Sequence, residues 1–227
     1  MKIKENIERV FTIIENKKNA SGVFYPITVV AITKTHPASV IREAITYGIK
    51  DIGENRVQEA EAKFSELQGI SFTRHMVGHL QENKVNKAAV IFDFIQSIDS
   101  LQTAERLNKK LMEINKKMPV LIEVNTSGEE SKFGIKPEEA EGFTEKIFEL
   151  PYLMLKGLMT IGPLTEDKQK IRRAFSNLYN LRERLKSIYK ADLSILSMGM
   201  SDDFEIAIEE GSNMLRLGRI LFGERNL

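Results

Sequence analysis

Short apolar runs alternate with longer amphipathic segments along most of the chain. The runs are rich in valine, isoleucine and leucine, which is typical of buried strands, whereas the longer segments repeat apolar residues at helical spacing. The pattern predicts strands at 27–33, 49–54, 71–78, 90–99, 119–126, 153–162, 193–200 and 213–218. It predicts helices at 1–18, 37–48, 55–68, 80–89, 100–117, 136–150, 165–189 and 201–211.

Strands that alternate with helices pair in parallel through crossover connections. Eight such units are the number that closes a (β/α)8 barrel, and 227 residues is close to the lower length of such barrels, about 200. A doubly wound open sheet is the alternative. No linker-like tract divides the sequence. We therefore expect an α/β fold with one TIM-type barrel domain over residues 1–227 and an extra N-terminal helix.

Composition limits the class of protein. Hydrophobic residues make up 42% and charged residues 29%, which suits a globular domain. The net charge of +1 and the absence of tryptophan give no support for a nucleic-acid partner. The absence of cysteine excludes disulfides and thiolate metal sites. No run reaches the roughly 18 apolar residues of a membrane span, and the charged start does not resemble a signal peptide, so we expect a soluble cytoplasmic protein.

Polar and small residues collect where the predicted strands end. In a barrel, the carboxyl ends of the strands carry the chemistry. Lys34 follows the first strand, and Asn55 follows the second. Later strand ends carry His75, Gly78, His79, Asp99, Asn125, Thr160, Gly162 and the segments 197–201 and 216–219.

The ends of the seventh and eighth strands are the usual phosphate-binding position of this architecture, and both carry glycine. Ser201 is expected to cap a helix beginning at Asp202, while Gly218 and Arg219 open the last helical turn. Backbone N–H groups at such places bind phosphate. Asp202 and Asp203 read as ordinary acids of a first helical turn, whose charges would compete with an anion.

Lys34 directly follows the run "VVAIT". A lysine surrounded by apolar barrel walls is desolvated, which favours its neutral, nucleophilic form and imine formation with a carbonyl. The plainer alternative is a lysine that reaches the barrel rim or pairs with Glu54 or Asp99. With a phosphate site across the same mouth, imine chemistry indicates either a phosphosugar aldolase or a pyridoxal 5′-phosphate (PLP) site.

Arg216 separates these two options in part. It lies one residue before "LG" at the end of the last strand, near the floor of the mouth. A guanidinium facing a pyridine nitrogen keeps that nitrogen unprotonated, which weakens PLP as an electron sink. The plainer alternative is an ion pair with a neighbouring acid.

Several motifs resemble the PLP homeostasis proteins, also called the proline synthetase co-transcribed or PLP-binding protein family. They are "VVAITKTHPASVIREAITYGIKDIGENRVQEA", "RHMVGHLQENK", "VLIEVNTSGEESKFGI", "LKGLMTIGP" and "LSMGMSDDFEIAIEEGSNMLRLGRILFGER". The resemblance runs from about Ile27 to Arg225. It implies a single barrel similar to the N-terminal domain of alanine racemase, with PLP held as a Schiff base.

The resemblance also implies roles for individual residues. Lys34 matches the Schiff-base lysine, and Arg216 matches the arginine that faces the pyridine nitrogen. The other matches line the cofactor or form the phosphate cradle: Asn55, His75, Gly78, Met200, Ser201, Gly218 and Arg219.

Two positions depart from the family pattern. Arg219 stands where many relatives have a small residue, often threonine, and His36 stands where many have a second lysine. His75 and His79 also suggest a metal site by their spacing, but they fall across a strand end and have few further ligands nearby, so we expect no metal.

Three functional hypotheses follow. The first is a non-catalytic PLP carrier in vitamin B6 homeostasis that affects amino-acid and keto-acid balance and hands PLP to apo PLP-dependent enzymes. The second is a PLP-dependent amino-acid racemase or another PLP enzyme, and the third is a regulatory protein for which PLP is a bound signal. Racemisation needs an acid or base on each face of the substrate carbon. No tyrosine stands in a motif near the mouth, and the chain ends just past the last strand. We therefore favour the carrier, and the resemblance favours a monomer.

Overall fold

The computed structural model describes residues 2–223. Eight parallel strands close into a barrel in sequence order. The ring closes where Thr28 to Ala31 of β1 pair with Met214 to Leu217 of β8. The strands are β1 (Thr28–Ile32), β2 (Asp51–Glu54), β3 (Thr73–Met76), β4 (Phe94–Ile98), β5 (Met118–Glu123), β6 (Leu153–Met159), β7 (Ile195–Ser197) and β8 (Met214–Leu217). The barrel predicted from the sequence is confirmed.

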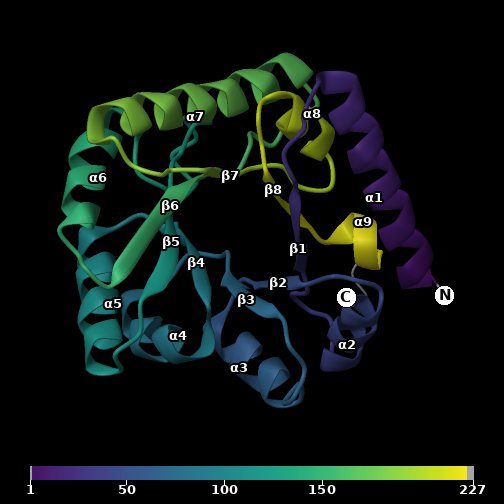
Figure 1. Ribbon diagram of the computed structural model, residues 1–227, viewed down its shortest axis with the longest axis horizontal. Helices are drawn as coiled ribbons and strands as arrows, with labels where there is room; N and C mark the ends of the chain where they lie inside the picture. The colour runs from purple at the N-terminus through teal and green to yellow at the C-terminus, as the bar shows by residue number, and fades with distance from the viewer. Residues whose placement is uncertain (1, 224–227) are drawn as a thin grey trace.

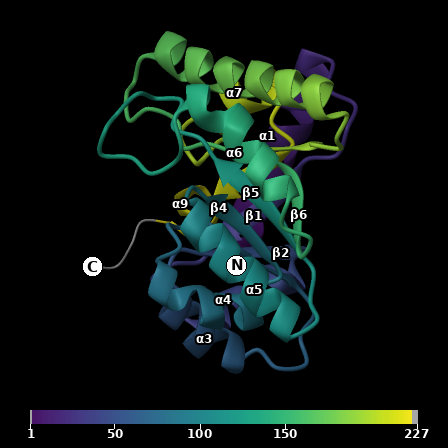
Figure 2. The same cartoon turned by 90° about the vertical axis from the view of Figure 1, so that its left-hand side faces the viewer.

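Helices surround the strands on the outside (Figures 1 and 2). In Figure 1, α7 runs across the top, α5 and α6 lie on the left, α3 and α4 lie at the bottom, and α1 covers the right. They are α1 (Lys2–Ser21), α2 (Ala38–Thr46), α3 (Val57–Ser65), α4 (Val85–Ile91), α5 (Leu101–Glu113), α6 (Ala140–Phe148), α7 (Lys168–Tyr189), α8 (Phe204–Glu209) and α9 (Arg219–Phe222). Short 3-10 turns, η1 (Glu82–Lys84) and η2 (Pro137–Glu139), precede α4 and α6.

The extra N-terminal helix, α1, is confirmed and completes the outer ring. Its apolar stripe of Ile7, Val10 and Ile14 is buried. The helix contacts α8, α9 and α2, and so covers the seam where the last strand meets the first. No helix within residues 2–223 is both long and apolar enough to cross a membrane.

Alternation along the strands divides the core into two layers. On β1, Val29 and Ala31 pack outward against the helices, whereas Val30 and Ile32 pack inside the barrel. Because side chains of a strand alternate between faces, Lys34 continues the inward-facing series beyond the end of β1. The inward-facing side of β1 therefore leads to Lys34 just beyond the end of the strand.

The described residues reach almost to the end of the motifs that carry the resemblance. Arg225, where that resemblance ends, lies outside them.

Candidate functional site

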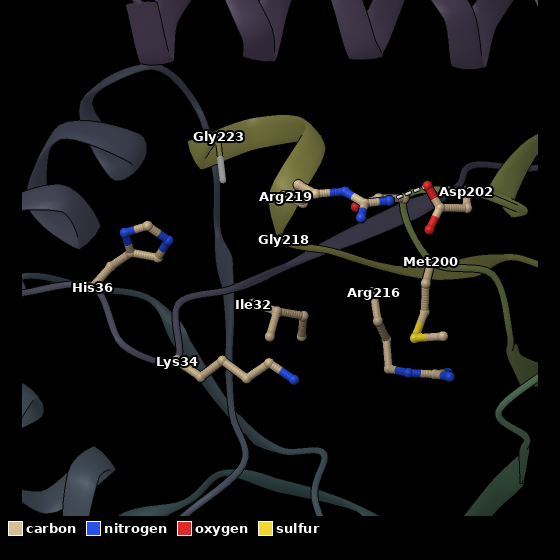
Figure 3. A pocket seen from close by; sticks show the side chains of 10 residues that line it. Ile32, Lys34, His36, Met200, Asp202, Arg216, Gly218, Arg219 and Gly223 are labelled. Carbon is tan, nitrogen blue, oxygen red and sulfur yellow. Dashed lines mark hydrogen bonds and ion pairs between the residues drawn. The ribbon is translucent and has the colours of Figure 1, made fainter. Parts of the chain in front are cut away.

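A cavity of about 500 Å³ opens at the carboxyl ends of β1, β7 and β8; we call it the mouth cavity. Three separate loops form its wall, those that follow β1, β7 and β8 (Figure 3). The described residues lining it are Ile32, Lys34, His36, Met200, Ser201, Asp202, Arg216, Gly218, Arg219 and Gly223. Six of the nine residues predicted for the site are among them: Lys34, Met200, Ser201, Arg216, Gly218 and Arg219.

Lys34 reaches into the mouth cavity from the loop after β1. Its side chain points toward the part of the cavity where Arg216 lies, with Ile32 close to its path (Figure 3). The acids considered as its alternative partners bond elsewhere: Glu54 accepts from Lys63 at 2.8 Å, and Asp99 contacts His79 at 3.2 Å. Figure 3 shows the amine of Lys34 directed into the mouth cavity.

Arg216 forms the floor of the mouth cavity and is only 4% exposed. Its Nη1 donates to Ser197 Oγ at 2.8 Å, and its Nη2 donates to the carbonyl of Thr160 at 2.7 Å. Burial lowers its pKa to about 10, and the negative charges of Glu123 and Asp203 oppose that shift. At neutral pH the guanidinium is therefore a fixed positive charge below the cavity.

The loop after β7 differs from the sequence prediction. Helix α8 begins at Phe204 rather than Asp202, so Ser201 does not cap it and the acids are not in its first turn. Instead, Asp203 accepts from the N–H of Met200 at 2.6 Å, and Ser201 Oγ accepts from the N–H of Ile220 at 3.3 Å. Ser201 thus joins this loop to the first turn of α9, on the rim of the cavity.

Gly199 explains why the helix starts late. Its φ of +100° suits glycine, and a Cβ there would lie 2.6 Å from the Cβ of Ala207. The turn at Gly199 directs the next residues along the cavity rim before α8 begins. On the same rim, Arg219 forms an ion pair with Asp202 (Figure 3). The acid that was expected to oppose an anion is therefore partly neutralised.

The other three predicted residues lie apart from the mouth cavity. Asn55 and Gly78 line a second cavity of about 790 Å³, which we call the β2–β3 cavity. His75 is 1% exposed inside the barrel, where Nε2 lies 2.9 Å from Asp51 Oδ1 and Nδ1 lies 3.0 Å from Gln96 Nε2. Their assignment as cofactor-lining residues stays a prediction.

Comparisons with known proteins fit this geometry. The sequence profile named "Alanine racemase, N-terminal domain" matches residues 4–226. The pyridoxal phosphate homeostasis protein of Aquifex aeolicus (strain VF5) is 44% identical over 193 residues, which cover 85% of each chain. The chain belongs to the pyridoxal phosphate homeostasis protein family. The resemblance inferred from the motifs is therefore confirmed.

Two solved structures place this family member among its structural neighbours. PipY of Synechococcus elongatus PCC7942, with PLP bound, is 32% identical and superposes with a TM-score of 0.86 over 97% of this chain and 100% of that one. An alanine racemase of Clostridium difficile 630 is 18% identical, with a TM-score of 0.78 over 97% of this chain and 58% of that one. At that identity the second likeness concerns the fold alone.

Sequence reasoning missed a buried polar chain beneath the mouth cavity of this family member. Gln96 on β4 joins His75 to Ser197, because its Oε1 accepts from Ser197 Oγ at 2.6 Å. Ser197 in turn accepts from Arg216. The signal was present as a glutamine among the apolar residues of the predicted strand "FDFIQSI". The chain fixes the orientation of Arg216 from across the barrel.

Glu123 is a second residue that the sequence analysis passed over. It ends β5, is 3% exposed, and its Oε2 has no hydrogen-bond partner among the described residues. Burial raises its pKa to about 7; the charge of Asp99 adds to the shift, and Arg216 opposes it. Glu123 therefore changes charge near neutral pH in the same buried region as Arg216.

Proposed function

We propose that this protein binds PLP in the mouth cavity, with Lys34 attached to it covalently, and acts in PLP homeostasis. One observation carries the proposal: a single cavity is bordered by the amine of Lys34, the guanidinium of Arg216, and a rim of Ser201, Gly218 and Arg219. The hydroxyl, backbone and guanidinium of that rim are groups that suit a phosphate. These residues come from strand ends that are far apart in the sequence. The names of the relatives support the same role.

The residues that line the cavity fit the cofactor chemically. Its volume of about 500 Å³ suits a small ligand, since such pockets span roughly 300–1,000 Å³. PLP needs an amine for its aldehyde, donors for its phosphate and a partner for its ring nitrogen. Lys34 offers the first, Ser201 and Arg219 offer the second, and Arg216 offers the third.

When bound, PLP supplies a reactive aldehyde and an electron-accepting ring. Lys34 would bond to the aldehyde carbon through its neutral amine, and the aldehyde oxygen would leave as water. The hydroxyl of Ser201, the backbone at Gly218 and the charge of Arg219 would hold the phosphate, and Met200 lines the same wall. Arg216, charged at neutral pH, would donate to the ring nitrogen and keep it unprotonated.

We propose further that the protein carries or regulates PLP without significant catalysis. Among the residues lining the mouth cavity, the candidates for proton transfer are Lys34, His36 and Asp202, and Asp202 is paired with Arg219. The proposed attachment uses Lys34, and an unprotonated ring nitrogen disfavours carbanion chemistry. Transfer of PLP to apo-enzymes, a monomeric state, a cytoplasmic location and a single domain over residues 1–227 belong to the same proposal.

The first experiment is a visible absorption spectrum of the purified protein with added PLP. The sample is then reduced with borohydride, and the labelled peptide is identified by mass spectrometry. Wild type should show an imine band and a pyridoxyl group on the peptide containing Lys34. Lys34→Ala should lose both.

Lys87→Ala is the matched control, because Lys87 is exposed and pairs with Glu61 on the outer surface. It should behave like wild type. Equal labelling of wild type and Lys34→Ala would contradict the proposal and would favour the phosphosugar aldolase hypothesis instead. Substantial racemase turnover by pure protein would instead contradict the carrier role alone.

A further inference from the structure

A buried lysine on a neighbouring helix bonds to the loop that carries Lys34. Lys63 on α3 is 8% exposed. Its ammonium donates to the carbonyl of Thr33 at 2.6 Å, to Glu54 Oε1 at 2.8 Å and to Glu59 Oε1 at 2.7 Å. We call these four residues the Lys63 cluster. An ammonium has three N–H donors, so the cluster uses all of them.

The Lys63 cluster holds the backbone on both sides of Lys34. Before the lysine, Thr33 gives its carbonyl to Lys63, and its hydroxyl donates to Glu54 Oε1 at 2.5 Å. After the lysine, the N–H of Thr35 donates to Glu59 Oε1 at 2.6 Å. Helix α3 is thereby tied to the residues before and after Lys34.

The backbone held in this way is strained. Thr35 has a φ of +69°, a left-handed conformation that β-branched residues rarely adopt. Such a conformation persists only where the surroundings impose it, and it is concentrated at functional sites. The turn at Thr35 lies next to the residue whose side chain reaches the mouth cavity (Figure 3). The bond from Thr35 to Glu59 is a contact that can impose it.

We propose that Lys63 is a positioning residue for Lys34: through Thr33 and Glu59 it holds the left-handed turn that directs the Lys34 amine at the aldehyde of PLP. The inference rests on the proposed function, because it concerns the same covalent attachment. The alternative is a purely structural role, in which Lys63 only balances the charge of Glu54, whose carboxylate is fully buried. If Lys63 positions Lys34, its substitution weakens covalent attachment of PLP but leaves non-covalent binding nearly unchanged. If its role is only structural, its substitution does not separate the two kinds of binding.

The test compares two ligands on Lys63→Met and wild type. PLP reports attachment through its imine band, whereas pyridoxine 5′-phosphate, an alcohol in place of the aldehyde, reports non-covalent binding alone. Loss of positioning should weaken imine formation about tenfold and leave pyridoxine 5′-phosphate affinity within about twofold. Amide hydrogen exchange at Thr35 should become faster in the variant.

A second substitution tests the strain directly. Glycine adopts the left-handed conformation without steric cost, so Thr35→Gly in the Lys63→Met background should restore most of the imine formation. If Lys63→Met does not fold, Glu59→Ala takes its place: it removes the acceptor of the Thr35 N–H and one of the three acceptors of Lys63, but leaves the bond between Lys63 and the buried Glu54 in place. Lys87→Met is the surface control.

Equal weakening of both ligands, no weakening of either, or no recovery with Thr35→Gly would overturn the positioning role. In each of these cases a wild-type imine on Lys34 would leave the proposed function intact. A wild-type protein that forms no imine would overturn the proposed function and, with it, the role of Lys63 toward the cofactor.

Discussion

The two cavities at the barrel mouth use polar residues differently. Around the mouth cavity, Lys34 and Arg216 direct their side chains at one space from strands that pair with each other (Figure 3). Around the β2–β3 cavity, two wall residues are directed at neighbouring side chains: Glu59 binds Lys63, and His79 contacts Asp99. The rings of His79 and Phe133 also stack, with their centroids 3.9 Å apart.

This difference indicates that the two cavities have different roles at the barrel mouth, one in ligand binding and the other in positioning the loops. Polar groups that face a common space can bind a ligand, whereas groups bonded to each other fix the positions of the loops around it. The first cavity would hold the cofactor, and the second would be lined by the support that keeps the first in shape. Pairs of matched variants, one from each side of the barrel mouth, test whether the two sides differ in this way.

The largest expected effect contrasts the two lysines. Lys63→Met leaves the buried carboxylate of Glu54 without its ammonium partner and should lower the free energy of unfolding by about 3 kcal/mol. Lys34→Met should change it by less than about 1 kcal/mol, because Lys34 is only partly buried. Denaturant unfolding without PLP measures both. Equal losses would mean that Lys34 also has a structural role and that the contrast is wrong.

An intermediate effect concerns Glu123, which ends β5 in the same buried region as Arg216. Burial raises its pKa from 4.5 to about 7. Within that window the folded state keeps a proton that the unfolded state has lost, so stability falls as pH rises and the cost persists above pH 7. Glu123→Gln should remove a fall of about 2.5 kcal/mol between pH 5 and pH 8.

The measurement for Glu123 is the difference between Glu123→Gln and wild type in unfolding free energy, taken at pH 5 and pH 8. The difference is needed because burial also raises the pKa of Glu54 and of Asp203. A pH-independent difference would show that Glu123 is ionised in the fold throughout this range.

The sequence predicted the fold well because periodicity carries that information locally. The apolar run at 27–33 predicted a buried strand, and in β1 Val29 and Ala31 pack outside the barrel while Val30 and Ile32 pack inside it. The predicted start of α8 was wrong because the chain makes a left-handed turn at Gly199, where Ala207 leaves no room for a side chain, and because Asp203 bonds to the N–H of Met200. A helix-start pattern cannot reveal such contacts.

The support of the site was harder to predict than its cavity-facing residues. Lys63 lies in a helix rich in charges, where a lysine normally faces solvent. Its bond to the carbonyl of Thr33 joins residues 30 positions apart and requires the barrel to be formed. Gln96 and Glu123 were missed for the same reason, since their partners lie on other strands.

The smallest expected effect compares two serine hydroxyls. Ser201 lies on the rim of the mouth cavity, whereas Ser97 is buried on β4 and donates to the carbonyl of Gly78 at 2.6 Å. Because one hydrogen bond contributes about 1 kcal/mol, Ser201→Ala should weaken PLP binding about fivefold with little change in stability. Ser97→Ala should lower stability by a similar amount and leave PLP affinity unchanged. Titration of the imine band and denaturant unfolding measure the pair, and the reverse pattern would place the phosphate on the β2–β3 side of the mouth.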